Sequence, residues 1–330
     1  MENHKRLLII ILFTIIIISA FGFEQFEFTM GNEYKIPAAL TIPKDKETFP
    51  LVMIVQGSGE AGIDNVVGEN ATIRDIAYEL SKNGIATFRY AKRNGLYPED
   101  FKLFTSETLK MEYLEDAQIA MESVLKVPGV KEIYLLGLSM GGYILPEIAD
   151  LLEARFDISI RGLILCASGI AKTPAPLVMF EQIKYQMETM GFSQEQIMAS
   201  KKTWEELCEN KLNEKTVIHP TMTAGYVYSI MKSDPYSRLK NADSKVLVIQ
   251  GDADRINAVK FFHEFKRDFK DKNDQKAQFE FMLFSEVNHR LMIKEYDDLY
   301  TDLMKKGVVD PRIIEGIVEW IKSTEEALEE

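Results

Sequence analysis

Three residue types in this sequence could together perform nucleophilic chemistry: a serine between two glycines, a histidine and an aspartate. The serine lies at the centre of Gly137-Leu138-Ser139-Met140-Gly141. A serine hydroxyl is a poor nucleophile at neutral pH, so a base must accept its proton. A sharp strand-to-helix turn exposes such a serine and needs small residues two positions away on each side. The motif therefore predicts a nucleophile elbow at Ser139.

The flanking sequence supports a strand before the motif and a helix after it. Ile133 to Leu136 is an apolar run of strand length, and Gly142 to Leu152 has helical apolar spacing. The backbone N–H of Met140 would then face the same place as the serine oxygen and supply half of an oxyanion hole. Pro146 disagrees with a regular helix, because proline removes a backbone hydrogen bond and is expected to kink it.

The second oxyanion donor is predicted in a turn earlier in the chain. Leu51 to Val55 is a continuous apolar run, typical of a strand buried on both faces, and Gln56-Gly57-Ser58-Gly59 follows it. A glycine-rich turn after such a strand lets backbone N–H groups face a ligand. We assign this role to the N–H of Ser58; the alternative is a turn that is merely tight.

A base and an acid follow two later predicted strands. The chain has four histidines, and His289 alone lies in a loop after a strand, Phe279 to Phe284. Of the others, His4 lies in the N-terminal segment, His219 precedes a proline, and His263 lies within a helical pattern. Asp252 and Asp254 follow the strand Val246 to Gln250; being two apart, they point the same way in an extended chain, so both stay open as the acid. The order serine, aspartate, histidine excludes chymotrypsin-like and subtilisin-like arrangements.

Strands that alternate with helices predict an α/β fold with a mostly parallel sheet and ligands beyond the carboxyl ends of the strands. The expected elements are an N-terminal hairpin (26–30 and 34–42), helices 72–83 and 110–126, and strands 85–90 and 162–166. Lys92 and Arg93 begin the loop 91–106. They could line a site, but charged loop residues are usually solvated, and we expect that here.

A long interval separates strand 162–166 from strand 246–250, and it predicts an inserted helical cap over residues 168–244. Its helical stretches are Leu177 to Met190 and Ser193 to Leu212. Their large apolar side chains are expected mainly to pack the cap on the core, although some could form an acyl pocket. Residues 23–167 and 245–330 would then form the core.

Composition and charge limit the class of partner. The chain has 330 residues, of which 46% are hydrophobic and 27% charged, as in globular proteins. Its formal net charge of -12 argues against nucleic acid or an anionic membrane surface as a partner and favours a neutral or cationic small substrate.

The spacing of Cys166 and Cys208 suggests no metal site, and no cofactor is expected. We expect both cysteines to be free; the alternative is a disulfide formed after export.

The N-terminus has the pattern of an export signal. Lys5 and Arg6 precede the apolar run Leu7 to Ile18, and Ala20-Phe21-Gly22 offers a cleavage site. We predict that residues 1–22 are a signal peptide and that the protein is periplasmic or extracellular. The alternative is an uncleaved membrane anchor.

With these motifs together, residues 26–330 resemble the α/β-hydrolase superfamily, and in particular the bacterial serine esterases related to EstD-type carboxylesterases and to dienelactone-hydrolase and prolyl-peptidase-like hydrolases. The resemblance rests on Gly137 to Gly141, Gln56 to Gly59 with Asp64, Ile85 to Arg93, Gly251-x-x-Asp254 and Asn288-His289. It implies that Asp254 rather than Asp252 is the acid. Ala91 stands where the family usually has aspartate.

The resemblance implies an α/β-hydrolase fold and a serine hydrolase of small carboxylic esters, of short to medium acyl length, with a Ser139–His289–Asp254 triad. Two alternatives stay open. A peptidase or acyltransferase could use the same triad, and a non-catalytic binding protein could keep the fold.

Overall fold

The structure is a computed structural model that describes residues 22–219, 221–242, 244–269 and 278–326. Apart from Gly22, the predicted export segment lies outside these residues. Within the described ranges, no helix has the length and apolar character needed to cross a membrane.

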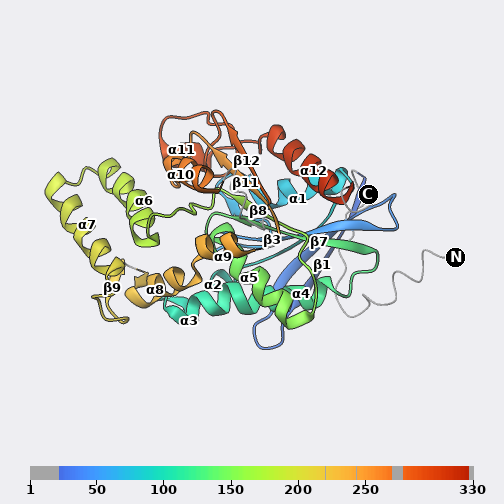
Figure 1. The fold of residues 1–330 in the computed structure, drawn as a ribbon, viewed down its shortest axis with the longest axis horizontal. Helices are drawn as coiled ribbons and strands as arrows, with labels where there is room; N and C mark the ends of the chain where they lie inside the picture. Colours follow the sequence, from blue (N-terminus) through green and yellow to red (C-terminus); the bar gives the residue numbers. More distant parts are fainter. Residues whose placement is uncertain (1–21, 220, 243, 270–277, 327–330) are drawn as a thin grey trace.

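The described chain builds one eight-stranded sheet, in the order β1-β2-β6-β3-β7-β8-β11-β12 (Figure 1). β1 and β2 pair antiparallel, as the predicted hairpin requires, and β2 pairs antiparallel with β6. Every later pairing from β6 to β12 is parallel. The strands are β1 (Phe23–Met30), β2 (Ile36–Pro43), β3 (Phe49–Val55), β6 (Ala86–Tyr90), β7 (Val130–Leu138), β8 (Gly162–Cys166), β11 (Lys245–Gly251) and β12 (Gln278–Phe284). The α/β fold with a mostly parallel sheet is confirmed.

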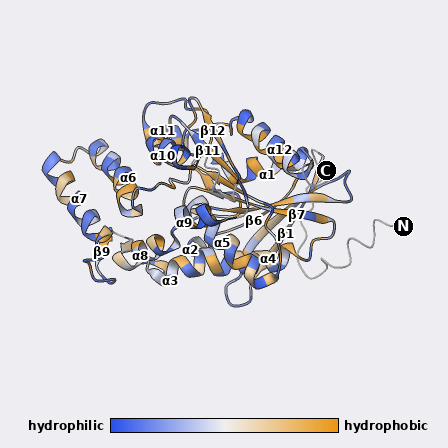
Figure 2. Ribbon diagram, in the orientation of Figure 1, coloured by the Kyte–Doolittle hydropathy of each residue, from blue (hydrophilic) through white to orange (hydrophobic). Residues whose placement is uncertain are grey.

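Helices cover both faces of the sheet, so the central strands are buried on both sides. β3 is buried along its whole length, with Val52 and Ile54 facing one core and Leu51 and Met53 the other. The first face carries α1 (Thr72–Lys82) and α12 (Pro311–Glu326); the second carries α4 (Asp116–Val124), α5 (Met140–Phe156) and α10 (Val259–Phe269). Figure 2 shows the hydrophobic strands between more polar helices.

The predicted helix over residues 110–126 is wrong in its details. The chain first forms α3 (Ser106–Leu109), then a π-helical turn over Lys110–Glu115, and only then α4, which ends at Val124. A π-helical turn shifts the register of a helix. The shift buries Glu112 and Tyr113, while the apolar Leu125, within the predicted helix, is 44% exposed. By contrast, α5 continues through Pro146.

The loop after β6 is also more ordered than expected. It contains α2 (Arg93–Leu96) and a 3₁₀ turn at Pro98–Phe101. Lys92 and Arg93 are not solvated, since they are only 3% and 2% exposed. Both have buried carboxylate partners, which the sequence does not place nearby.

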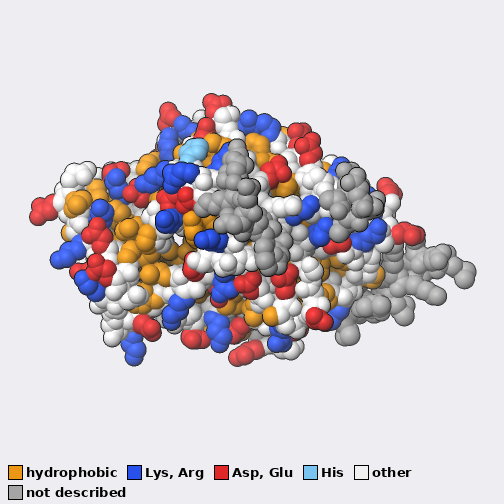
Figure 3. Space-filling model, in the orientation of Figure 1, with side chains coloured by type: hydrophobic (Ala, Val, Ile, Leu, Met, Phe, Trp, Pro, Cys, Tyr) orange, Lys and Arg blue, Asp and Glu red, His pale blue; other side chains and the backbone are white. Residues whose placement is uncertain are grey.

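Between β8 and β11 the chain forms a largely helical segment with a small core of its own. α6 and α7 pack together and against α8, around Phe180, Trp204 and Leu207. The elements are α6 (Ala175–Thr189), α7 (Gln194–Cys208), β9 (Val217–His219), β10 (Met222–Thr223), α8 (Ala224–Ser233) and α9 (Pro235–Asn241). Figure 3 shows hydrophobic side chains gathered at the left, over this segment. Short elements elsewhere are β4 (Val66–Val67), β5 (Asn70–Ala71) and α11 (Leu299–Met304).

The start of α12 carries a pH-dependent contribution to stability. Asp310 accepts hydrogen bonds from the backbone N–H of Arg312 at 3.0 Å and from its Nε at 3.0 Å. These bonds to Arg312 hold the pKa of Asp310 below its usual 3.8. We expect Asp310→Ala to lower the free energy of unfolding by about 1 kcal/mol at neutral pH. Because the native pKa is lowered, this contribution is present above the usual pKa and is lost as the pH falls through the native value. Urea unfolding at a series of pH values measures it.

Asp310→Asn is the control, because asparagine also caps helices but cannot ionise. The stability difference between wild type and Asp310→Asn should shrink toward acid pH. A difference that stays constant down to acid pH would contradict the role of the charge.

Candidate active site

Ser139 occupies a strained turn between β7 and α5, as the motif predicts. Its φ of 55° and ψ of -123° lie in a region that residues with side chains rarely adopt. A Cβ on Gly137 would lie 2.4 Å from the carbonyl oxygen of Gly141, and one on Gly141 would lie 2.3 Å from that of Val55. Only glycine fits at either position, so the two glycines allow the turn that exposes Ser139.

The two predicted oxyanion donors lie beside the serine. Ser58, Ser139 and Met140 line one pocket. Gly57 packs against the serine, since a Cβ on it would lie 3.1 Å from the Cβ of Ser139. Met140 is the first residue of α5, where backbone N–H groups have no partner within the helix. The N–H groups of residues 58 and 140 therefore belong to segments that meet at the serine.

His289 and Asp254 are brought together although far apart in the sequence. Nδ1 of His289 lies 2.9 Å from Oδ2 of Asp254, whose side chain is fully buried. The other oxygen of Asp254 accepts the backbone N–H groups of Ile256 and Asn257, each at 2.8 Å. These bonds fix the carboxylate in one orientation. With Nδ1 facing a carboxylate, Nε2 is the ring nitrogen free to act as a base.

Asp252, which the residues alone left open as the acid, lies elsewhere. It is exposed, and its carboxylate accepts the backbone N–H of Glu286 at 2.7 Å. The carboxylate that contacts the imidazole is that of Asp254.

The His289–Asp254 pair and Ser139 lie at the same edge of the sheet, but no hydrogen bond joins the pair to the serine. Ser139 follows β7, Asp254 follows β11 and His289 follows β12, all at carboxyl ends. Asn257, whose N–H bonds Asp254, also lines the pocket with Ser139. Within the described residues, no hydrogen bond connects His289 to the Ser139 hydroxyl.

The pocket at Ser139 is small and mostly apolar, with a volume of about 190 Å³. Its walls come from α5, from the loop after β8 and from the helical segment between β8 and β11. The residues of that helical segment that line it include Ala175, Val178, Met179, Ile183, Met222, Tyr226 and Ile230. Polar groups reach it from Gln182, Gln186 and His219. A ligand at Ser139 would thus contact both parts of the chain.

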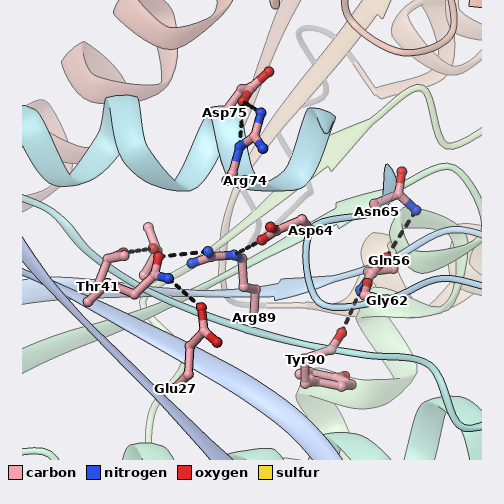
Figure 4. A network of polar contacts seen from close by, with 12 residues as sticks. Glu27, Thr41, Gln56, Gly62, Asp64, Asn65, Arg74, Asp75, Arg89 and Tyr90 are labelled. Atoms are coloured by element: carbon pink, nitrogen blue, oxygen red, sulfur yellow. Dashed lines mark hydrogen bonds and ion pairs between the residues drawn. The ribbon is translucent and has the colours of Figure 1, made fainter. Parts of the chain in front are cut away.

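Sequence reasoning missed the residues that support the site. Gln250 donates to Oδ2 of Asp254 at 2.9 Å, and its place as a buried polar side chain directly after the apolar run 246–249 could have signalled this. Gln56 accepts from Asn65 at 3.0 Å and donates to the carbonyl of Gly62 at 2.9 Å (Figure 4). Arg290, next to His289, donates to Oδ1 of Asn65 at 2.7 Å. This chain of bonds links the loop after β3 to the histidine loop.

A second set of contacts anchors the loop after β3 to the sheet. The buried Arg89 donates from Nε to Asp64 at 3.0 Å (Figure 4). Asp64 is one of the residues that carry the family resemblance, and its partner shows why it matters to the loop.

The described residues offer no site for a metal, since no three His, Cys, Asp or Glu side chains among them lie close enough to hold one. Cys166 and Cys208 are both free, the first buried at the end of β8 and the second at the end of α7.

Comparison with known proteins identifies the family. The model of an α/β-hydrolase family described as serine aminopeptidase S33 matches residues 67–297, a range that contains Ser139, Asp254 and His289. The chain belongs to this family. It is also 30% identical over 304 residues to esterase EstD of Thermotoga maritima, a match that covers 91% of this chain and 68% of EstD. The predicted family is confirmed, and the protein is a serine hydrolase.

Solved structures agree on the fold. Est1E from Butyrivibrio proteoclasticus matches with a TM-score of 0.55 at 17% identity, covering 90% of this chain and 98% of Est1E. A hyperthermophilic esterase from Pyrobaculum calidifontis matches with a TM-score of 0.54 at 16% identity, covering 91% of this chain and 85% of the esterase. Both comparisons place this S33-family chain in the α/β-hydrolase fold.

Proposed function

We propose that this protein hydrolyses small carboxylic esters through an acyl-enzyme on Ser139, with His289 as the base and Asp254 as the orienting acid. The observation that carries the proposal is the 2.9 Å contact of Nδ1 of His289 with a buried, hydrogen-bonded Asp254, at the same edge of the sheet as the elbow serine. The similarity to a protein named as an esterase supports an ester as the substrate.

In the first step, Nε2 of His289 takes the Ser139 proton while Oγ attacks the ester carbonyl carbon. The carbonyl oxygen becomes an oxyanion that accepts the N–H groups of Ser58 and Met140. Asp254 keeps the imidazole in the required tautomer and stabilises its protonated form. As the carbon–oxygen ester bond breaks, the imidazolium returns the proton to the leaving alcohol.

In the second step, His289 takes a proton from water, and the hydroxide attacks the acyl carbon. The proton then passes to Oγ of Ser139 as the carboxylic acid leaves. The bond between His289 and Ser139 forms when substrate is present, since catalytic hydrogen bonds are often long in ligand-free sites and tighten in the complex.

The pocket volume supports a short to medium acyl group. The apolar walls from Val178, Met179 and Ile183 suit an alkyl chain, and about 190 Å³ leaves little space for a long one. In this proposal residues 168–244 form a cap that closes the pocket over Ser139, with residues 23–167 and 245–330 as the hydrolase core. Residues 1–22 direct export to the periplasm or beyond and are then removed.

A peptidase is the second candidate, and the family description as serine aminopeptidase favours it. Peptide substrates with a free amino terminus would need a carboxylate near the scissile bond. No Asp or Glu is among the described residues that line the pocket at Ser139, so we favour the ester.

The test combines covalent labelling with turnover. A fluorophosphonate probe should form a single adduct on Ser139, located by mass spectrometry. The unlabelled enzyme should hydrolyse p-nitrophenyl butyrate and p-nitrophenyl octanoate faster than p-nitrophenyl palmitate. It should hydrolyse aminoacyl p-nitroanilides slowly. Faster turnover of the anilides would support the peptidase instead. A folded protein that forms no adduct would contradict the assignment of Ser139.

A further inference from the structure

A buried lysine lies directly beneath the loop that carries the second oxyanion donor. Nζ of Lys92 donates to the carbonyl oxygen of Gly57 at 2.9 Å and to the hydroxyl of Tyr113 at 3.0 Å. The ammonium also lies 3.6 Å from Glu112 and 4.6 Å from the centre of the Tyr113 ring. Lys92 is 3% exposed. Burying a charge is costly unless the charge is paired and hydrogen-bonded, as this ammonium is.

The contact with Gly57 matters because of peptide geometry. The carbonyl of Gly57 and the N–H of Ser58 belong to one planar peptide unit, in which the two groups point in opposite directions. Whatever fixes the direction of the carbonyl therefore fixes the direction of the N–H. Gly57 itself lies against the Cβ of Ser139, so a small rotation of this peptide would move the N–H relative to the reacting carbonyl.

The loop needs such an anchor. Ser58, Gly59 and Glu60 are exposed, and the φ of Gly59 is +89°. An exposed, glycine-containing turn can sample several peptide orientations. A charge-assisted hydrogen bond is stronger than a neutral one and withdraws electrons from the peptide, which makes the N–H a better donor.

Two elements of the fold hold the lysine in place. Its backbone N–H donates to the carbonyl of Ala61 at 2.8 Å, which ties the start of the loop after β6 to the oxyanion loop. The π-helical turn at Lys110–Glu115 buries both Glu112 and Tyr113, and both side chains contact the ammonium. Burial raises the pKa of Glu112, while the nearby Lys92 opposes that rise.

We propose that Lys92 is a positioning residue for the oxyanion hole: it holds the Gly57–Ser58 peptide so that the Ser58 N–H faces the oxyanion. This inference rests on the proposed function, since it assigns a role in the same reaction. In this proposal the π-helical turn places Glu112 and Tyr113, the two partners of the lysine.

The test removes the lysine without leaving a buried charge unpaired. Losing one partner of a buried ion pair is strongly destabilising, whereas replacing both by neutral groups is often tolerated. The variant is therefore Lys92→Met/Glu112→Gln. The matched control is Arg93→Met/Asp116→Asn, which removes the neighbouring ion pair on the same two segments. Arg93 and Asp116 are equally buried, and the arginine side chain contacts Asp116, Glu115 and Tyr34.

Two inhibitors separate positioning of the oxyanion hole from general damage. A trifluoromethyl ketone with an octyl chain adds to Ser139 and places an oxyanion in the hole, whereas the matching methyl ketone binds without adding. Removing one oxyanion donor costs about 100- to 1000-fold in kcat, so misplacing one should cost less. For Lys92→Met/Glu112→Gln we expect kcat for p-nitrophenyl butyrate to fall by about 10- to 100-fold with KM little changed. Affinity for the trifluoromethyl ketone should fall by the same factor and that for the methyl ketone should not.

The control should keep the wild-type ratio of affinities for the two ketones. An unchanged kcat in Lys92→Met/Glu112→Gln would overturn the proposal, as would equal losses for both ketones or the same selective loss in the control. If thermal unfolding shows that this variant does not fold, Lys92→Gln/Glu112→Gln replaces it, because the glutamine amide ends one bond short of the ammonium position. A wild type with no ester turnover would instead contradict the proposed function, which keeps the two failures distinct.

Discussion

Ser139→Ala should abolish almost all ester hydrolysis, with kcat falling by about a millionfold. The reason is that the alanine has no oxygen to form the acyl-enzyme, so only binding and the oxyanion donors remain to assist attack by water. Turnover of p-nitrophenyl butyrate measures the loss, and fluorophosphonate labelling of the same variant should disappear. The free energy of unfolding should hardly change, because the strained φ of 55° is imposed by the elbow and not by the hydroxyl.

Ser168→Ala is the matched control. Ser168 is a second serine on the wall of the same pocket and is 7% exposed. Its replacement removes the same atom from the same cavity and should alter kcat by only a few-fold. Comparable losses in the two variants would show that damage to the pocket, and not loss of a nucleophile, explains the effect.

Asp254→Asn should lower kcat by about ten-thousandfold while the fold is kept. The asparagine can donate its amide to Nδ1 of His289, which stabilises the tautomer whose Nε2 carries a proton and cannot accept one from Ser139. The backbone N–H groups of Ile256 and Asn257 can still bond to the remaining amide oxygen. Steady-state kinetics with an ester, alongside thermal unfolding, measures the two effects separately.

Asp252→Asn is the control for this variant, since the residue is two positions away, chemically identical and exposed. It accepts a backbone N–H from Glu286 and does not contact the imidazole in the described residues. Activity should stay within a few-fold of the wild type. A larger loss from Asp252→Asn than from Asp254→Asn would reverse the assignment of the acid.

The elements around the site were predictable because their signals are local. β3 and β8 are continuous apolar runs and β11 contains the apolar run 246–249, and the structure places the three strands where that pattern does. The helix 72–83 ends before Gly84, whose φ of +86° explains the stop. The elbow was predictable for the same reason, since only glycine fits at positions 137 and 141.

Errors arose where long-range packing overrode local pattern. The predicted helix over 110–126 starts instead with a π-helical turn, because burying Glu112 and Tyr113 beside Lys92 requires a shift that apolar spacing does not show. Lys92 and Arg93 looked like ordinary solvated loop residues, since the carboxylates that neutralise them lie in a different helix.

By itself, the sequence determined the fold class and predicted Ser139 as the nucleophile and His289 as the base, because a nucleophile elbow is a local backbone requirement and the chain has few histidines. It did not choose between Asp252 and Asp254 without the family resemblance. Only the tertiary structure pairs His289 with Asp254 at 2.9 Å, since that contact depends on the parallel pairing of β11 with β12. Likewise, only the tertiary structure brings Lys92 to the carbonyl of Gly57. The physical reason is that such contacts arise between strands that are adjacent in the sheet and distant in the chain.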